Sequence, residues 1–214
     1  MRNRKYWIYG LVGCVLFGVG DWLLGFVDPA VVTEQFDVLK AGHGVGYDLG
    51  KITVTLLLGA VGVPFMMLGG MRVAELVTDE KRKNLLRFTM MLLPVGWLLI
   101  HFTVSCGIYA YAWNAQNGGQ ALDMALDVMK VLKPSQIVAD IFAAAALILL
   151  PVYVLRGKTV LPKSSQLFTP ALWMALLAGV KFFVPATPFS NGIDTFCMNA
   201  GMIVWFLYLM VKQP

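Results

Sequence analysis

The chain has 214 residues, of which 58% are hydrophobic and only 14% are charged, and its mean hydropathy is +0.72. Soluble domains are typically about 45 to 50% apolar, so this composition excludes an ordinary soluble domain and indicates an integral membrane protein. We attribute the formal net charge of +5 to membrane topology, and we expect no nucleic-acid partner.

Six segments are long and apolar enough for transmembrane helices. A helix needs roughly 20 residues to cross a hydrocarbon core of about 30 Å. The segments are 6–26, 49–71, 88–113, 137–155, 167–184 and 195–211. Since the connections between them are short, residues 1–214 are predicted to form one all-α bundle of six transmembrane helices, with no separate soluble domain.

The first segment follows Arg2, Arg4 and Lys5, which is also how a secretory signal begins. A signal has a shorter apolar region and a small-residue cleavage site. Neither is found here, so the first helix is expected to be retained.

The distribution of basic residues predicts the orientation. Twelve of the 17 Lys and Arg residues fall at the two termini and in the even-numbered connections, and five fall in or beside the odd-numbered ones. Basic residues concentrate on the cytoplasmic side, so both termini are predicted to be cytoplasmic. We expect a multi-pass protein of a bacterial plasma (inner) membrane.

The first outer connection contains signals for a short surface helix. Asp28 and Pro29 suit an N-cap and a first helical position, and Gly42 suits a helix end. His43 follows between two glycines, in GHGVGYD. It is interpreted as an ordinary surface residue or as a residue at a cavity mouth.

The second outer connection, NGGQALDMALDVMKVLKPSQ, has the pattern of an amphipathic helix. Apolar residues recur at helical spacing, opposite Asp123, Asp127 and Lys130. It is predicted to lie flat on the outer interface, as a plain connector or as a lid. In the second connection on the cytoplasmic side, Thr78 or Asp79 is expected to cap the third helix.

Charged residues within the outer halves of the predicted spans are the strongest functional signal. An aspartate at the centre of a membrane helix costs about 2.5 to 3.5 kcal/mol, so such residues normally face the protein interior and mark a function. Asp21 interrupts the apolar stretch FGVGDWLLGF. It is expected to pair with Lys181 or Lys51, and Asp140 is expected at a similar level. Asp194 is interpreted as the N-cap of the last helix.

His101 lies near the middle of the third span. Trp97, Ser105 and Tyr109 share its helical face, so this stripe is predicted to line a cavity that runs from the membrane centre outward. The alternative is that His101 only hydrogen-bonds a neighbouring helix and specifies packing.

Small residues predict which helices approach closely. Cys14, Gly18, Asp21 and Gly25 share one face of the first helix. The second helix has a similar stripe of Thr55, Gly59, Gly62 and Gly69, and the two stripes are expected to pack together. Cys106 and Cys197 lie at comparable depth, which leaves a disulfide between them open.

Two kinds of function, and a structural alternative, are compatible with these residues. The first is a carrier or receptor-like protein with an outward-facing polar cavity that binds a small amphipathic or protonatable ligand. The second is a membrane enzyme that acts on a lipid-like substrate from the outer leaflet, with His101, Asp21 and Asp140 as candidate catalytic residues. The third is a scaffold whose charges only specify packing. The predicted ligand-binding residues are Asp21, His101, Ser105, Tyr109, Asp140, Lys181 and Asn199.

No cofactor is expected, and no His or Cys spacing suggests a metal site. The expected partners are the lipid bilayer and a small amphipathic or lipid-like ligand. The oligomeric state does not follow from the sequence.

Overall fold

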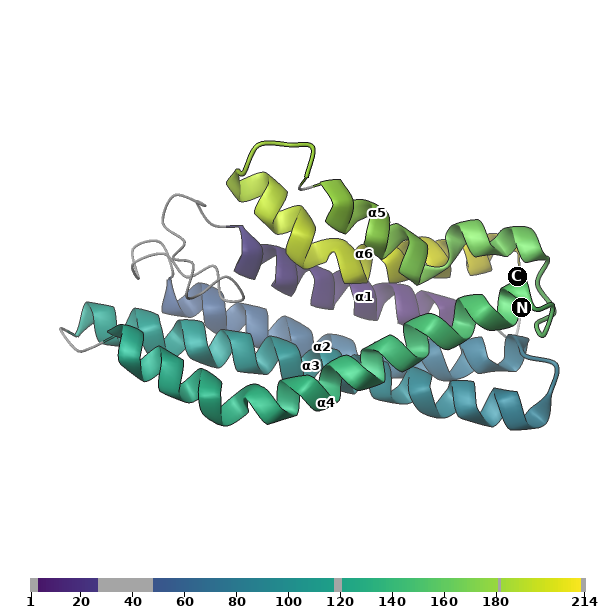
Figure 1. Cartoon of the computed structure of the whole chain (residues 1–214), viewed down its shortest axis with the longest axis horizontal. Helices are drawn as coiled ribbons and strands as arrows, with labels where there is room; N and C mark the ends of the chain where they lie inside the picture. The colour runs from purple at the N-terminus through teal and green to yellow at the C-terminus, as the bar shows by residue number, and fades with distance from the viewer. Residues whose placement is uncertain (1–3, 27–47, 118–120, 181, 213–214) are drawn as a thin grey trace.

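The computed structural model describes residues 4–26, 48–117, 121–180 and 182–212 (Figure 1). Within these ranges the elements are α1 (Arg4–Gly25), α2 (Leu49–Val73), η3 (Ala74–Leu76), α3 (Glu80–Gln116), α4 (Ala121–Leu155), η4 (Lys163–Phe168), α5 (Pro170–Val180) and α6 (Pro188–Lys212). The described part of the chain contains helices and no named strand, so the predicted all-α class is confirmed. The predicted surface helix before His43 falls in 27–47, outside the described residues.

Five helices, α1, α2, α3, α4 and α6, are long and apolar enough to cross a membrane. The fifth predicted segment, 167–184, differs from the expectation. Its α-helix, α5, has 11 residues, or about 16 Å of helical rise. Pro170 explains the late start, because a residue before proline is disfavoured in the helical conformation, and Thr169 is extended.

The outer part of α4 is not a separate surface helix. A single helix of 35 residues runs from Ala121 to Leu155 and passes through Pro134 without a break. It packs beside α3, where a Cβ on Gly96 would lie 2.9 Å from the carbonyl oxygen of Ala139. The prediction of a separate flat amphipathic helix is therefore wrong, since the described part of this segment belongs to the same long helix, α4.

Small residues bring α1 against both α2 and α6. A Cβ on Gly13 would lie 2.7 Å from the Gly62 carbonyl oxygen, so α1 and α2 are in backbone contact there, as the stripe on α2 predicts. The face of α1 is different from the predicted one. A Cβ on Gly18 would meet Phe196, and one on Gly25 would meet Thr195, so this face packs on α6. The prediction that it packs on α2 is wrong, because α1 has two small-residue faces.

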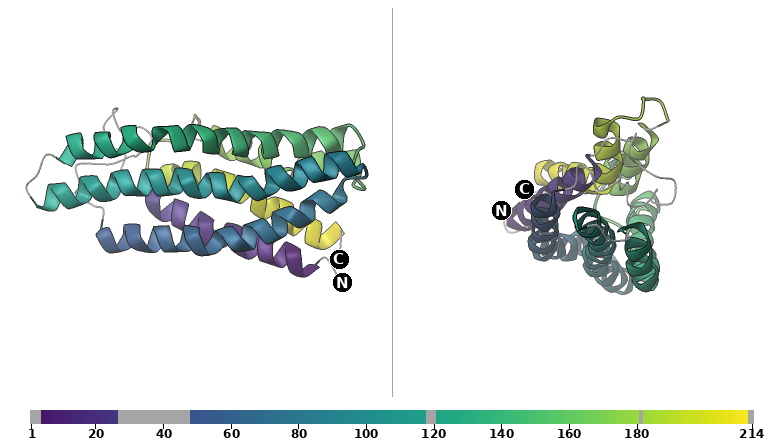
Figure 2. Two further views of the ribbon diagram at one scale, coloured as in Figure 1. Left: turned by 90° about the horizontal axis from the view of Figure 1, so that it is seen from below. Right: turned by 90° about the vertical axis from the view of Figure 1, so that its left-hand side faces the viewer.

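The helices follow one another around the bundle in the order α4, α3, α2, α1, α6 and α5 (Figure 2). Each packs extensively on its neighbours in this order, whereas α5 makes few contacts with α4. Large side chains from several helices fill the core, including Trp7, Phe17, Trp97, Trp205 and Phe206.

Paired connections close the end of the bundle where α1 begins and α6 ends (Figure 1). Val77 and Thr159 form an isolated antiparallel bridge, and the Thr78 amide donates a 3.0 Å hydrogen bond to the Lys158 carbonyl. Asp79 accepts a hydrogen bond of 2.9 Å from the Arg82 amide, which confirms it as the cap of α3.

Candidate functional site

The carboxylate of Asp21 and the imidazole of His101 form the centre of a buried polar cluster between α1 and α3. Asp21 Oδ1 lies 2.7 Å from His101 Nδ1. The His101 side chain is 1% exposed and that of Asp21 is 13% exposed. Asp21 is four residues before the end of α1, a distance of about 6 Å along the helix. Lys51, one of the two predicted partners of Asp21, is not part of this cluster, and the other, Lys181, lies outside the described residues.

The contact of the second ring nitrogen, Nε2, shows how many protons the Asp21–His101 pair holds. His101 Nε2 lies 3.0 Å from the backbone carbonyl oxygen of Thr55 on α2. A carbonyl can only accept, so Nε2 carries a hydrogen and donates it. One further proton is shared between Nδ1 and Asp21. The pair is therefore neutral overall, whether this proton sits on the ring or on the carboxyl group.

Asn199 on α6 completes the cluster. Its side-chain Nδ2 donates a 2.6 Å hydrogen bond to Asp21 Oδ2, and the residue is fully buried. One carboxylate thus links three helices, α1, α3 and α6, and the imidazole adds α2. The sequence predicts Asn199 and His101 as site residues but does not predict that both contact Asp21.

Glycines on α1 and α2 make room for the imidazole. A Cβ on Gly59 would lie 3.0 Å from His101 Cδ2, and one on Gly20 would lie 3.0 Å from the Thr55 carbonyl oxygen. The ring of Phe17 lies beside that of His101, with centroids 4.9 Å apart. The histidine of α3 therefore occupies a slot between α1 and α2 that side chains larger than glycine would obstruct.

A cavity of about 370 Å³ lies against the cluster. Asp21 and His101 form part of its wall, and Asp194 and Thr195 add polar groups. The remaining lining is mostly apolar and comes from α1, α3, α5 and α6: Phe17, Leu24, Trp97, Ile100, Val104, Met174, Ala178, Cys197 and Met198. The site thus combines a hydrogen-bonded polar wall with a larger apolar surface.

Buried polar atoms with spare hydrogen-bonding capacity are concentrated around this cluster. Thr55 Oγ1, Trp97 Nε1, Ser105 Oγ and Asn199 Oδ1 are buried and have no partner among the described residues. In folded proteins most buried polar atoms are hydrogen-bonded. Of the six buried side-chain atoms without a partner among the described residues, these four belong to residues of the cluster or to its neighbours on α3.

The structure brings together only part of the predicted ligand-binding set. Trp97 and His101 of the predicted stripe line the cavity, whereas Ser105 is buried beside it and does not line it. Asp140 is exposed on α4 and does not contribute to the cavity. Lys181 lies outside the described residues.

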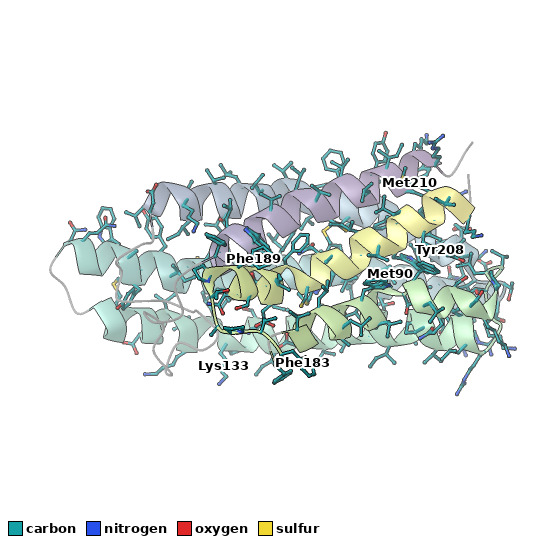
Figure 3. The ribbon with its side chains drawn as sticks, turned by 90° about the horizontal axis from the view of Figure 1, so that it is seen from above. Met90, Lys133, Phe183, Phe189, Tyr208 and Met210 are labelled. Carbon is teal, nitrogen blue, oxygen red and sulfur yellow. The ribbon has the colours of Figure 1, made fainter. Side chains whose placement is uncertain are left out.

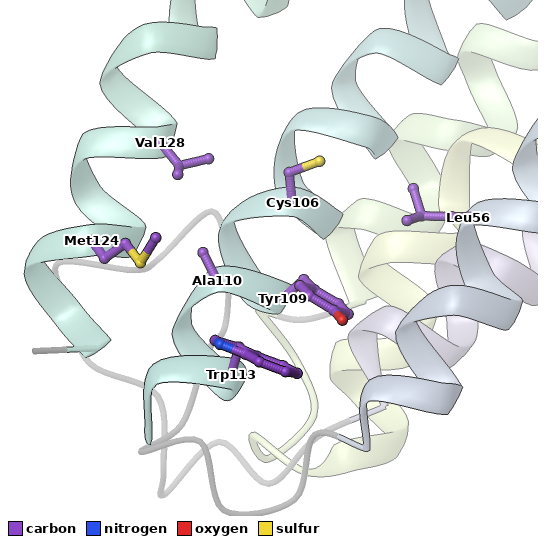
Figure 4. Close-up of a pocket in the computed structure, with 7 residues that line it drawn as sticks. All are labelled: Leu56, Cys106, Tyr109, Ala110, Trp113, Met124 and Val128. Atoms are coloured by element: carbon purple, nitrogen blue, oxygen red, sulfur yellow. The ribbon is translucent and has the colours of Figure 1, made fainter. Parts of the chain in front are cut away.

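Tyr109 belongs to a second pocket, of about 620 Å³, on the other side of α3 (Figure 4). Its ring is stacked on that of Trp113, with centroids 6.4 Å apart. The lining also includes Leu56, Cys106, Ala110, Met124 and Val128. This pocket is almost wholly apolar, and no residue of the Asp21 cluster lines it. The predicted stripe on α3 therefore contributes residues to two different pockets: Trp97 and His101 to the first, and Tyr109 to the second.

Two other predictions need correction. Asp194 lies inside α6 instead of capping it, because α6 begins at Pro188. Thr187 caps this helix, since its side chain accepts a 3.1 Å hydrogen bond from the Ser190 amide. The expected pairing of Lys51 with Asp21 is also wrong. The Lys51 side chain instead donates a 3.3 Å hydrogen bond to the Phe26 carbonyl oxygen.

The cysteines Cys14, Cys106 and Cys197 are all free thiols. In the described part of the chain, no group of three or more His, Cys, Asp or Glu side chains could hold a metal ion.

Several site residues give no signal in the sequence. Thr55 acts through its backbone carbonyl, which no residue type reveals, although its position on the small-residue stripe indicates that it faces a neighbouring helix. Met174, Ala178 and Met198 line the cavity but look like ordinary membrane-helix residues.

Comparisons with known proteins bear on the family only. No curated protein and no solved structure matches the chain. A family model described as "Family of unknown function (DUF6796)" matches residues 1–213, and the chain therefore belongs to this family.

Proposed function

We propose that this protein is an integral membrane protein that binds a small amphipathic or protonatable ligand in the cavity beside Asp21 and His101, as a carrier or receptor-like protein. The observation that carries the proposal is the mixed lining of this cavity. A hydrogen-bonded carboxylate and imidazole stand at one wall, and apolar side chains make up most of the rest. Ligand pockets are typically of this kind, with a few placed polar groups in an apolar surface.

The proposed membrane topology has six crossings, with α5 and the turn before it completing the fifth. Eleven described Lys and Arg residues lie at or near the end where α1 begins and α6 ends, against three acidic residues. By the positive-inside rule this end is cytoplasmic, and the Asp21 cavity then opens towards the outer half of a bacterial inner membrane.

Binding is favoured over acid–base catalysis by the state of His101. Both ring nitrogens are engaged, one by Asp21 and the other by the Thr55 carbonyl. A general base needs a free nitrogen within reach of the proton that it abstracts. The imidazole is therefore suited to hold Asp21 in place. A membrane enzyme remains the second candidate function, because the Asp21–His101 contact is the one feature of the described site that resembles an acid–base pair.

The scaffold alternative is less favoured because the cluster borders a cavity. A pair that only holds helices together needs no open volume beside it, and the adjacent buried atoms of Trp97 and Asn199 retain hydrogen-bonding capacity.

The proposal is tested by asking what small molecule remains bound after purification. The protein is extracted in mild detergent, and bound molecules are measured by mass spectrometry. Val104→Trp fills the cavity, whereas Phe102→Trp is the matched control, because Phe102 is 49% exposed on the same helix. We expect a molecule retained by the parent and by Phe102→Trp and reduced at least tenfold in Val104→Trp. Equal retention in all three, or none in the parent, would contradict the proposal.

A further inference from the structure

The helix α5 is packed on one side only. Of its 11 residues only Pro170 is buried. Its first turn is held tightly against α6, where a Cβ on Gly201 would lie 2.5 Å from the Pro170 carbonyl oxygen. The far end is open, because a Cβ on Gly179 would have no heavy atom within 4 Å among its described neighbours.

The preceding turn, η4, strengthens the anchored end. The hydroxyl groups of Ser165 and Tyr208 are hydrogen-bonded at 2.6 Å. The ring of Phe168 stacks on that of Tyr208, with centroids 4.4 Å apart. α5 therefore has one fixed end, next to the closed end of the bundle, and one end with few packing contacts.

The weakly packed end of α5 forms one wall of the Asp21 cavity. Met174 and Ala178 line the cavity, facing a wall of α3 that includes Ile100 and Val104. α4 contributes no lining residue, and α5 makes few contacts with it. Among the described residues, the cavity wall opposite α3 on this side is thus formed by α5 and not by α4.

This side of the molecule has an apolar surface. Leu176 on α5 is 55% exposed. Phe183, in the connection from α5 to α6, is also strongly exposed (Figure 3). Since Asp21 on the cavity wall lies about 6 Å before the end of α1, these side chains would face hydrocarbon and the membrane interface in a bilayer. A molecule that passes α5 would come from the lipid phase.

We infer that the ligand of this cavity is a single-chain lipid, which enters sideways from the bilayer past the loosely packed end of α5. This inference rests on the proposed function. The polar head would reach the Asp21–His101 wall, and the chain would lie along Val104, Met174 and Ala178. The volume of about 370 Å³ is near the lower limit of ligand pockets, about 300 to 1,000 Å³, which favours one chain over a diacyl lipid.

The test uses a long-chain fatty alcohol that carries a photoactivatable diazirine in its chain. The full chain is reconstituted into phosphatidylcholine nanodiscs, the probe is added and activated, and labelled peptides are identified by mass spectrometry. We expect labelling at the cavity positions Ile100 and Val104 on α3 and Met174 and Ala178 on α5, which fragmentation of the peptides distinguishes from the exposed Phe102 and Leu176. In a second arm, the diazirine is carried on a phosphatidylcholine acyl chain, and labelling of Ile100 and Val104 is expected to be at least fivefold weaker.

Matched substitutions on α5 separate cavity binding from general lipid contact. Ala178→Trp narrows the cavity and should lower labelling of Ile100 and Val104 at least fivefold. Leu176→Trp lies on the exposed surface of the same helix and should leave it unchanged. Met174→Phe serves as a second cavity variant if Ala178→Trp does not fold. Labelling of Ile100 and Val104 that is equal in the cavity variant and the parent would overturn the inference, as would labelling of exposed residues such as Phe102 alone.

The two proposals fail in different ways. If the ligand comes from water, Val104→Trp still loses the co-purified molecule while the diazirine lipid leaves Ile100 and Val104 unlabelled in the parent. That result overturns the lipid inference and keeps the proposed function. If nothing co-purifies and no probe labels the cavity, both are overturned.

Discussion

The side-chain amide of Asn199 donates a hydrogen bond of 2.6 Å to Asp21, a residue 178 positions earlier in the chain. His101 binds the other oxygen of the same carboxylate. Each oxygen of Asp21 thus has a different helix as its partner, and the charge that looks most costly in the sequence is the point at which three helices meet.

Removing the Asp21 carboxylate is expected to destabilise the fold. Asp21→Ala leaves a buried imidazole and a buried amide without their acceptor, and breaking a buried pair in this way costs about 3 to 5 kcal/mol. Asp21→Asn should cost less, because its carbonyl oxygen can still accept one hydrogen bond. Thermal unfolding in detergent checks this order. Two variants as stable as the parent would show that the cluster contributes nothing to stability.

The Asp21–His101 contact is expected to appear as a coupling energy. In a double-mutant cycle with Asp21→Asn and His101→Gln, residues in direct contact should be coupled by about 0.5 to 3 kcal/mol. Asp21→Asn combined with Asp140→Asn is the control, since Asp140 is exposed and outside the cluster. That pair should be additive within about 0.5 kcal/mol. Equal coupling in both cycles would contradict the geometry.

The close contact of α1 and α2 predicts a different response at two glycines. In Gly62→Ala the new Cβ would lie 2.8 Å from the backbone oxygen of Gly13, so the helices must separate. Overpacking of this kind typically costs about 1 to 3 kcal/mol. Gly179→Ala meets nothing within 4 Å and should be neutral or slightly stabilising, because alanine favours helix. Thermal unfolding of both variants measures the difference. A Gly62→Ala protein as stable as the Gly179→Ala protein would argue against the close contact of α1 and α2.

The connection that closes the bundle depends on Gly157, which has a φ of +62°. Gly157→Ala should lower stability by about 1 to 2 kcal/mol, because a Cβ disfavours the left-handed conformation. Gly157→Asn should be tolerated better, since asparagine adopts this conformation more readily. The midpoint of thermal unfolding measures both effects. The same loss in the two variants would mean that backbone conformation is not the cause.

Much of the architecture could be predicted because it depends on local properties. Apolar segments of sufficient length indicate α1, α2, α3, α4 and α6 directly. The glycines of α2 indicate a closely packed face, and Asp79 indicates a helix start. These features follow from the length, the spacing and the chemistry of neighbouring residues, which are all visible in one segment.

The site could be predicted only in its residue types. Asp21, His101 and Asn199 stand out because polar side chains in an apolar helix are costly. Their pairing could not be derived, because hydrogen bonds between helices depend on the rotation and depth of each helix, and no segment contains that information. Lysine was the expected partner of Asp21 on charge alone, whereas the fold supplies histidine and asparagine.

The sequence by itself thus determined the helical class, most helix positions and the small set of polar residues within apolar helices, since hydrophobicity and periodicity act locally. Only the tertiary structure decided that Asp140 stays on the surface while His101 enters a slot between α1 and α2. The physical reason is packing: glycines at Gly20 and Gly59 leave space for one ring, and the side chain that fills this space has hydrogen-bond partners on both nitrogens.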